Sequence, residues 1–179
     1  KHPLSSEVES AGEQMETALK SLDAFCDKHN FQVVCIPPNS DPGSHKMKMV
    51  LEKYSEKGWL IKAETLPRLQ FINLMRHARA LVGNSSMGIL EAPHYKMPVV
   101  NIGNRQQGRL NAGNVDFVPY EIDEIVGAME KAVHNEKYRE KIRNLKNPYG
   151  DSSAPIKVRK AIESVDLNNR KWYVKRKLC

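Results

Sequence analysis

The sequence predicts an α/β fold built on a parallel sheet with helices on both faces, which is a doubly wound sheet. Short apolar segments of strand length alternate with helical patterns along the chain, and no repeat interrupts them. Residues 31–36 (FQVVCI) are almost continuously apolar, as a parallel strand covered on both faces should be. Residues 80–114 combine a strand, a Gly-Asn-Ser-Ser turn, a helix and a second strand.

The N-terminal third contains a helix, a strand and a second helix. Residues 5–29 carry apolar side chains at helical spacing, namely Val8, Met15, Leu19, Leu22 and Phe25. The strand 31–36 is followed by the loop PPNSDPGS, whose last residue, Ser44, suits the N-cap of a helix over 45–57.

The next elements are a weaker strand at 58–63 and a helix over 67–77. Pro67 is accepted in the first helical turn because that position needs no N–H donor. The central unit follows, with apolar strands at 80–82 and 99–100.

The C-terminal part completes the alternation. Val115–Val118 is the last expected strand. A helix over 121–143 follows, with three acidic residues in its first turn and an apolar stripe that belongs to the core. A final helix is expected from Ser153 to about Asp166.

The turn of the central unit predicts an anion site. Gly83 accepts the backbone angles of a tight turn, and the expected helix from Ser85 begins with unpaired N–H groups and a positive dipole end. Such a helix end binds phosphates. The hydroxyls of Ser85 and Ser86 either cap this helix or donate to a phosphate oxygen.

Three charged side chains extend this candidate site. Glu91 lies about 7.5 Å further along the helix than Ser86, a depth that suits ribose hydroxyls, although a solvated glutamate is the alternative. Arg105 and Arg109 lie in a glycine-containing loop, where guanidinium groups suit a diphosphate. Either arginine is equally compatible with an ordinary surface position.

Composition limits the function classes. The chain has 179 residues, 40% of them hydrophobic, which suffices for one globular domain with a core. It has no signal peptide and no transmembrane run, and its three cysteines form no CxxC pair, so we expect a cytoplasmic protein. The six histidines lack metal-ligand spacing, so no metal site is expected.

The positive charge is concentrated at the C-terminus. The formal net charge is +7, but residues 168–179 hold five basic residues and no acidic one, so the rest is nearly neutral. Beside Trp172 and Tyr173, this tail suits an acidic surface or nucleic acid; a solvated terminus is the preferred interpretation. We therefore expect neither nucleic acid nor a membrane as a partner.

Several motifs together resemble one enzyme family. Residues 82–109, VGNSSMGILEAPHYKMPVVNIGNRQQGR, are similar to the nucleotide-binding signature of the hydrolysing UDP-N-acetylglucosamine 2-epimerases. The Asn-Ser-Ser turn and the NIGxRQxGR loop of this chain resemble the hydrolysing branch of the family rather than the non-hydrolysing branch. Further matches are His2-Pro3, PNSDPGS and YGDSSA, so the resemblance spans roughly residues 1 to 167.

The resemblance implies an architecture. It places residues 1–167 as a UDP-binding, Rossmann-like domain, the C-terminal half of a glycosyltransferase-B-like fold, with 168–179 as a basic tail. The family binds its nucleotide sugar in the cleft between two such domains and forms homo-oligomers. Because Lys1 falls where the first strand of this domain would end, we expect the chain to be a C-terminal fragment. The resemblance implies no cofactor.

The resemblance also implies site residues. The UDP-binding positions are His2, Asn39, Leu66, Ser85, Ser86, Glu91 and Arg105. Leu66 would meet the uracil through its backbone. His2 and Arg105 are the catalytic candidates, because they would stabilise the charge that grows on departing UDP.

The implied reaction removes UDP from UDP-N-acetylglucosamine by anti elimination and adds water, giving N-acetylmannosamine for sialic acid biosynthesis. The acid and base residues of the family lie in the N-terminal domain, so this chain should bind UDP without turnover. A UDP-sugar-dependent glycosyltransferase and a non-catalytic nucleotide-sugar-binding module are the alternatives. Further substituents on the sugar remain open.

Overall fold

The computed structural model describes residues 1–166 and 168–169, and the chain divides into two compact units, 1–148 and 149–179. Nearly all of the predicted basic tail, including Trp172 and Tyr173, lies outside the described residues. The predicted boundary after residue 167 stays a prediction.

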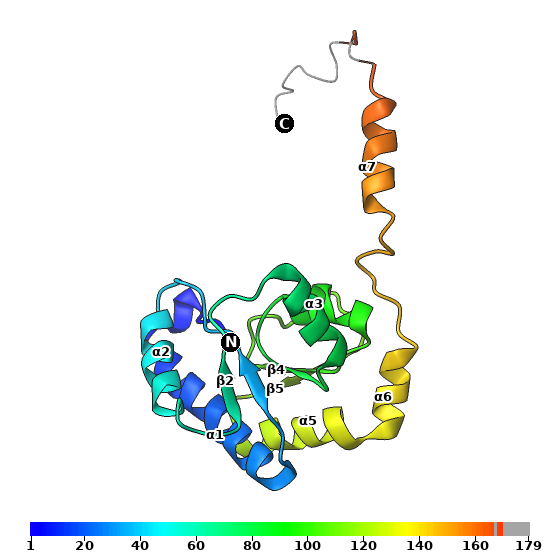
Figure 1. Cartoon of the computed structure of the whole chain (residues 1–179). Helices are drawn as coiled ribbons and strands as arrows, with labels where there is room; N and C mark the ends of the chain where they lie inside the picture. Colours follow the sequence, from blue (N-terminus) through cyan, green and yellow to red (C-terminus); the bar gives the residue numbers. More distant parts are fainter. Residues whose placement is uncertain (167, 170–179) are drawn as a thin grey trace. The chain divides into compact units, whose positions relative to one another are not determined.

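Helices and strands alternate along the first unit, as the sequence predicts (Figure 1). The strands are β1 (Val33–Cys35), β2 (Leu60–Lys62), β3 (Leu81–Gly83), β4 (Val99–Ile102) and β5 (Val115–Val118). The α-helices are α1 (Ala11–His29), α2 (Ser44–Lys53), α3 (Arg68–His77), α4 (Met87–Leu90), α5 (Ile122–His134) and α6 (Glu136–Arg143). Two 3₁₀ helices occupy Ser5–Glu7 and Ala92–Tyr95, and the second unit contains α7 (Ala154–Glu163).

All strand pairs are parallel. β1 pairs with β2, and β3, β4 and β5 form a second sheet in that order. The β1–β2 and β3–β4 connections contain helices, whereas β4 and β5 are joined by the loop 103–114. These pairings and crossovers confirm the predicted α/β class.

Strand β4 shows why helices are needed on both faces. Its four residues are all buried. Val100 and Ile102 pack into a cluster that includes residues of α1 and α5, whereas Val99 packs with Met75 of α3 in a second cluster. Because successive side chains point to opposite faces of a strand, each face of β4 is covered by its own helices.

The described strands form two sheets rather than one. The edges of β1 and β3 that carry no strand pairing among the described residues both line a cavity of about 580 Å³. Most of its lining is apolar, including Leu19, Phe71 and Met75. The separation of the sheets is thus a gap between two edge strands.

Several helix boundaries differ from the predictions. The first helix begins at Ala11 rather than residue 5, and α2 ends at Lys53 rather than residue 57, with Gly43 instead of Ser44 as its N-cap.

The helix expected over 121–143 breaks at Asn135, whose side-chain oxygen accepts from the Tyr138 N–H at 2.9 Å and caps α6. Pro67 is the N-cap of α3 rather than a residue of its first turn. The helix expected from Ser85 is only the four-residue α4.

No helix within the described residues is both long and apolar enough to span a membrane.

Candidate functional site

Asn84 organises the turn after β3. Gly83 has φ +147°, and Asn84 follows it with no exposed surface. The Asn84 side chain accepts from the His2 N–H at 2.6 Å and donates to the His2 carbonyl at 2.8 Å. Two backbone groups near the start of the chain are thereby fixed beside the turn.

The backbone carbonyl of Asn84 brings the loop after β4 to the same place. Arg105 Nη1 donates to it at 3.0 Å, and Gln106 Nε2 donates at 3.2 Å. Sequence reasoning singled out Arg105 and His2, which the structure brings to one turn, but it missed the asparagine that joins them. The position of Asn84 inside the Gly-Asn-Ser-Ser turn is the sequence feature that points to it, but the prediction assigned the role of this turn to Ser85 and Ser86.

The His2 imidazole is half-buried and is not fully paired. No hydrogen-bond partner among the described residues reaches its buried Nδ1. Burial lowers the pKa of His2, the Arg105 guanidinium acts in the same direction, and a hydrogen bond with Asn39 opposes them. The ring is therefore neutral at pH 7 and offers both a donor and an acceptor.

The helix that follows the two serines is shorter than predicted. Ser85 Oγ accepts from the Met87 N–H at 3.4 Å, whereas Ser86 makes no side-chain cap. The helix behind them ends at Leu90, because the chain continues as a 3₁₀ helix containing Pro93. Any anion there would depend on the turn N–H groups and hydroxyls, since four residues give only a small dipole.

A second cavity contains two more of the predicted residues. It measures about 430 Å³ and is lined by Ile36, Glu64, Thr65, Leu66, Arg68, Phe71 and Glu91. Leu66 is half-buried, and Glu91 pairs with Arg68 at 3.4 Å. Ile36 and Phe71 line both cavities, so the two are neighbours.

Asn39 hydrogen-bonds to His2 and to its own turn, whereas Arg109 contacts its own loop. Asn39 Nδ2 donates to Asp41 Oδ2 at 2.5 Å, and its Oδ1 accepts from the Asp41 N–H at 3.4 Å, so it serves the local turn. Exposed Arg109 donates to Gln106 Oε1 at 2.8 Å.

The structure brings the predicted residues together in two groups. His2, Ser85 and Arg105 surround the Asn84 turn, with Ser86 beside them, and Leu66 and Glu91 line the second cavity. Ile36, Asn84 and Gln106 follow the carboxyl ends of β1, β3 and β4, the edge at which ligands bind in open parallel sheets.

One group of metal-ligating side chains was not foreseen. His29, Glu130 and His134 place their ligand atoms within 4.8 Å of one another. The spacing of Glu130 and His134 along one helix is a signal that sequence reasoning overlooked.

The comparisons with known proteins agree with the geometry. A sequence model of the family described as UDP-N-acetylglucosamine 2-epimerase matches residues 2–163. The hydrolyzing GDP/UDP-N,N'-diacetylbacillosamine 2-epimerase of Campylobacter jejuni is 35% identical over 133 residues, covering 73% of this chain and 33% of that protein. The hydrolyzing UDP-N,N'-diacetylbacillosamine 2-epimerase of Legionella pneumophila is 29% identical over 169 residues, covering 94% of this chain and 42% of that protein.

Solved structures share the fold. MnaA of S. aureus, solved with UDP, has a TM-score of 0.73 at 21% identity, covering 90% of this chain and 44% of that one. UDP-GlcNAc 2-epimerase of Neisseria meningitidis, bound to UDP-GlcNAc, has a TM-score of 0.68 at 24% identity, covering 87% of this chain and 42% of that one. The chain thus spans about two fifths of the length of these structures and of the Legionella relative.

Proposed function

Because the chain belongs to the UDP-N-acetylglucosamine 2-epimerase family, we propose that it is the UDP-binding part of a hydrolysing 2-epimerase. The observation that carries this proposal is the convergence of His2, Ser85 and Arg105 on the Asn84 turn. A guanidinium, a neutral imidazole and hydroxyl groups are the donors that a diphosphate requires.

The two cavities suggest how UDP lies in the site. The diphosphate would meet Arg105, His2 and the two serines. The ribose and the uracil would occupy the second cavity, with Glu91 accepting from ribose hydroxyls and the backbone of Leu66 beside the base. In this arrangement Glu91 exchanges its exposed pairing with Arg68 for the ligand, which costs little because both side chains are solvated.

The proposed chemistry starts with loss of UDP from the sugar. Breaking the C1–O bond leaves negative charge on the diphosphate, and donors fixed beforehand stabilise that charge most effectively. Arg105 is fixed by its hydrogen bond to Asn84, so little reorganisation is needed. The proton transfers at the sugar would use carboxyl groups outside this chain, so the chain alone would bind UDP without turnover. Water addition would then give N-acetylmannosamine, a precursor of sialic acid.

A more substituted sugar is the second candidate substrate. The Campylobacter jejuni and Legionella pneumophila relatives are both named for N,N'-diacetylbacillosamine. That sugar keeps the 2-acetamido group at which the reaction takes place, so the UDP site described above would serve either substrate.

Saturation-transfer NMR tests the proposal directly. The chain is mixed with UDP-N-acetylglucosamine, and the uridine protons should receive saturation while no N-acetylmannosamine accumulates. A polypeptide that also contains the preceding domain should release N-acetylmannosamine and UDP. Transfer of the sugar to an acceptor would instead identify a glycosyltransferase, and absence of saturation at uridine in both proteins would contradict the proposal.

A further inference from the structure

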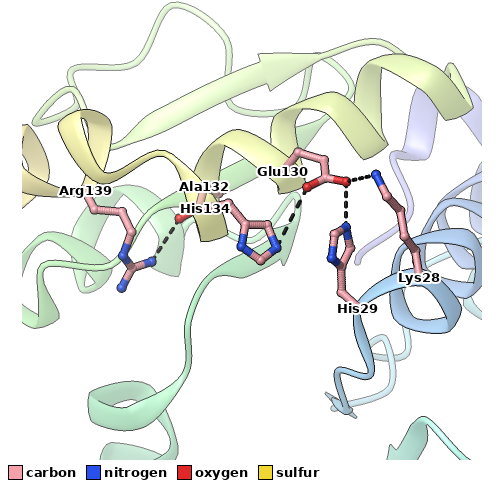
Figure 2. A network of polar contacts seen from close by, with 6 residues as sticks. All are labelled: Lys28, His29, Glu130, Ala132, His134 and Arg139. Carbon is pink, nitrogen blue, oxygen red and sulfur yellow. Dashed lines mark hydrogen bonds and ion pairs between the residues drawn. The ribbon is translucent and has the colours of Figure 1, made fainter.

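The C-terminal ends of α1 and α5 meet through an unusual set of side chains (Figure 2). Glu130 Oε1 lies 2.6 Å from His29 Nε2, and Glu130 Oε2 lies 3.8 Å from His134 Nε2. Both imidazoles thus present their Nε2 atoms to the same carboxylate. We propose that His29, Glu130 and His134 form a Zn²⁺ site that joins α1 to α5.

The donor set suits this ion. Two imidazole nitrogens and one carboxylate oxygen are ligands that Zn²⁺ accepts in proteins, with a water molecule as the fourth. Bonds of about 2.1 Å in a tetrahedral site place neighbouring donors about 3.4 Å apart. The three donor atoms already lie within 4.8 Å of one another, so small side-chain rotations complete the site.

The backbone and neighbouring rings hold the ligands in place. Glu130 and His134 are four residues apart on α5, which puts them on one helical face. The centroid of the His29 ring lies 4.8 Å from that of Phe25 and 4.6 Å from that of His134. The Phe31 ring packs edge-on against His134, with 6.1 Å between the ring centroids. These contacts keep both imidazoles beside the Glu130 carboxylate.

Lys28 is the competitor that the site must displace. Its Nζ lies 2.7 Å from Glu130 Oε1, the same oxygen that His29 contacts. The Lys28 side chain is 65% exposed, so it can turn into solvent when a divalent cation takes its place. Glu130 is therefore an anion shared between a lysine and the metal, and removing the lysine charge should strengthen metal binding.

The Zn²⁺ site is separate from the nucleotide site. His29 precedes β1, and α5 runs back from the end of β5, so both helices end beside the amino edge of the strands. The candidate UDP-binding loops follow the carboxyl ends. The ion would fasten two helices of the core and would not take part in the reaction at the sugar.

Zn²⁺ calorimetry on the metal-free chain tests this proposal. One saturable ion per chain is expected, and both His134→Ala and Glu130→Gln should weaken binding by more than about tenfold, since even changes around a metal ligand cost about that much. His94→Ala, which removes an exposed histidine elsewhere, is the matched control and should leave the affinity unchanged. Circular dichroism of each metal-free variant verifies its fold.

Two further measurements separate the site from incidental binding. Lys28→Gln should raise the Zn²⁺ affinity, and Co²⁺ bound to the unmodified chain should show visible bands that His134→Ala removes. The proposal would be overturned by the lack of a saturable site, by equal affinities in the chain, His134→Ala and Glu130→Gln, or by a Lys28→Gln affinity that is unchanged or lower.

Discussion

Replacing Arg105 by alanine separates ligand binding from folding. In the proposed complex this guanidinium donates to a phosphate, and a hydrogen bond to a charged group contributes about 1.5–3 kcal/mol. Because about 1.4 kcal/mol corresponds to a tenfold change, UDP should bind roughly 10- to 150-fold more weakly to Arg105→Ala. The free energy of unfolding should fall by only about 0.5–1.5 kcal/mol, because Gln106 still donates to the Asn84 carbonyl.

The assay is a UDP titration paired with urea unfolding, and the control is an arginine from the same loop. Arg109→Ala removes an exposed guanidinium that contacts Gln106 and should leave UDP affinity nearly unchanged. A folded Arg105→Ala chain with unaltered UDP affinity would refute the assignment of Arg105 to the phosphate site. Equal weakening by both substitutions would point to general positive charge instead of a specific contact.

Three other substitutions test separate parts of the account. Glu91→Gln should weaken UDP binding by about 1.5–3 kcal/mol and 2′-deoxy-UDP binding by less, as measured by titration; equal losses would argue against a ribose contact. Gly88→Ala should lower the free energy of urea unfolding by about 1–3 kcal/mol, because the new Cβ would lie 2.8 Å from Val99 Cγ1, whereas Gly58→Ala, with open space around it, should not. Burial opposes ionisation of Asp23, but hydrogen bonds from Lys57 at 2.9 Å and Trp59 at 2.6 Å outweigh it and lower the pKa of Asp23. The resulting stabilisation is complete above the ordinary aspartate pKa of 3.8 and is lost as the pH falls through the lower folded-state pKa. Urea midpoints should therefore fall less on acidification in Asp23→Asn than in the unmodified chain, and identical pH profiles would exclude this source of stability.

The order of elements was predictable from the sequence because it depends on local apolar patterns. The last strand was predicted as Val115–Val118 and lies there. Boundaries that depend on a single polar side chain were harder to predict. The break at Asn135 follows from its side chain capping α6, an interaction that apolar periodicity does not reveal.

The candidate site was predictable only in its parts. The motif around Ser85, Glu91 and Arg105 predicted a site in the segments that follow β3 and β4, because binding residues are frequent on loops held by a rigid scaffold. The role of Asn84 depends on its contacts with His2, which is 82 positions away in the chain, and with Arg105, which is 21 positions away. No local pattern encodes contacts of this range. His29 and Glu130 likewise meet only because α1 packs on α5.

The most direct test of the central claim is isothermal calorimetry of the chain with UDP, CDP and UMP. The account predicts one saturable UDP site, with weaker binding of CDP because the base differs and of UMP because one phosphate is missing. Equal affinities for the three nucleotides, or no heat with UDP for either this chain or a longer polypeptide of the length of the curated relatives, would contradict it.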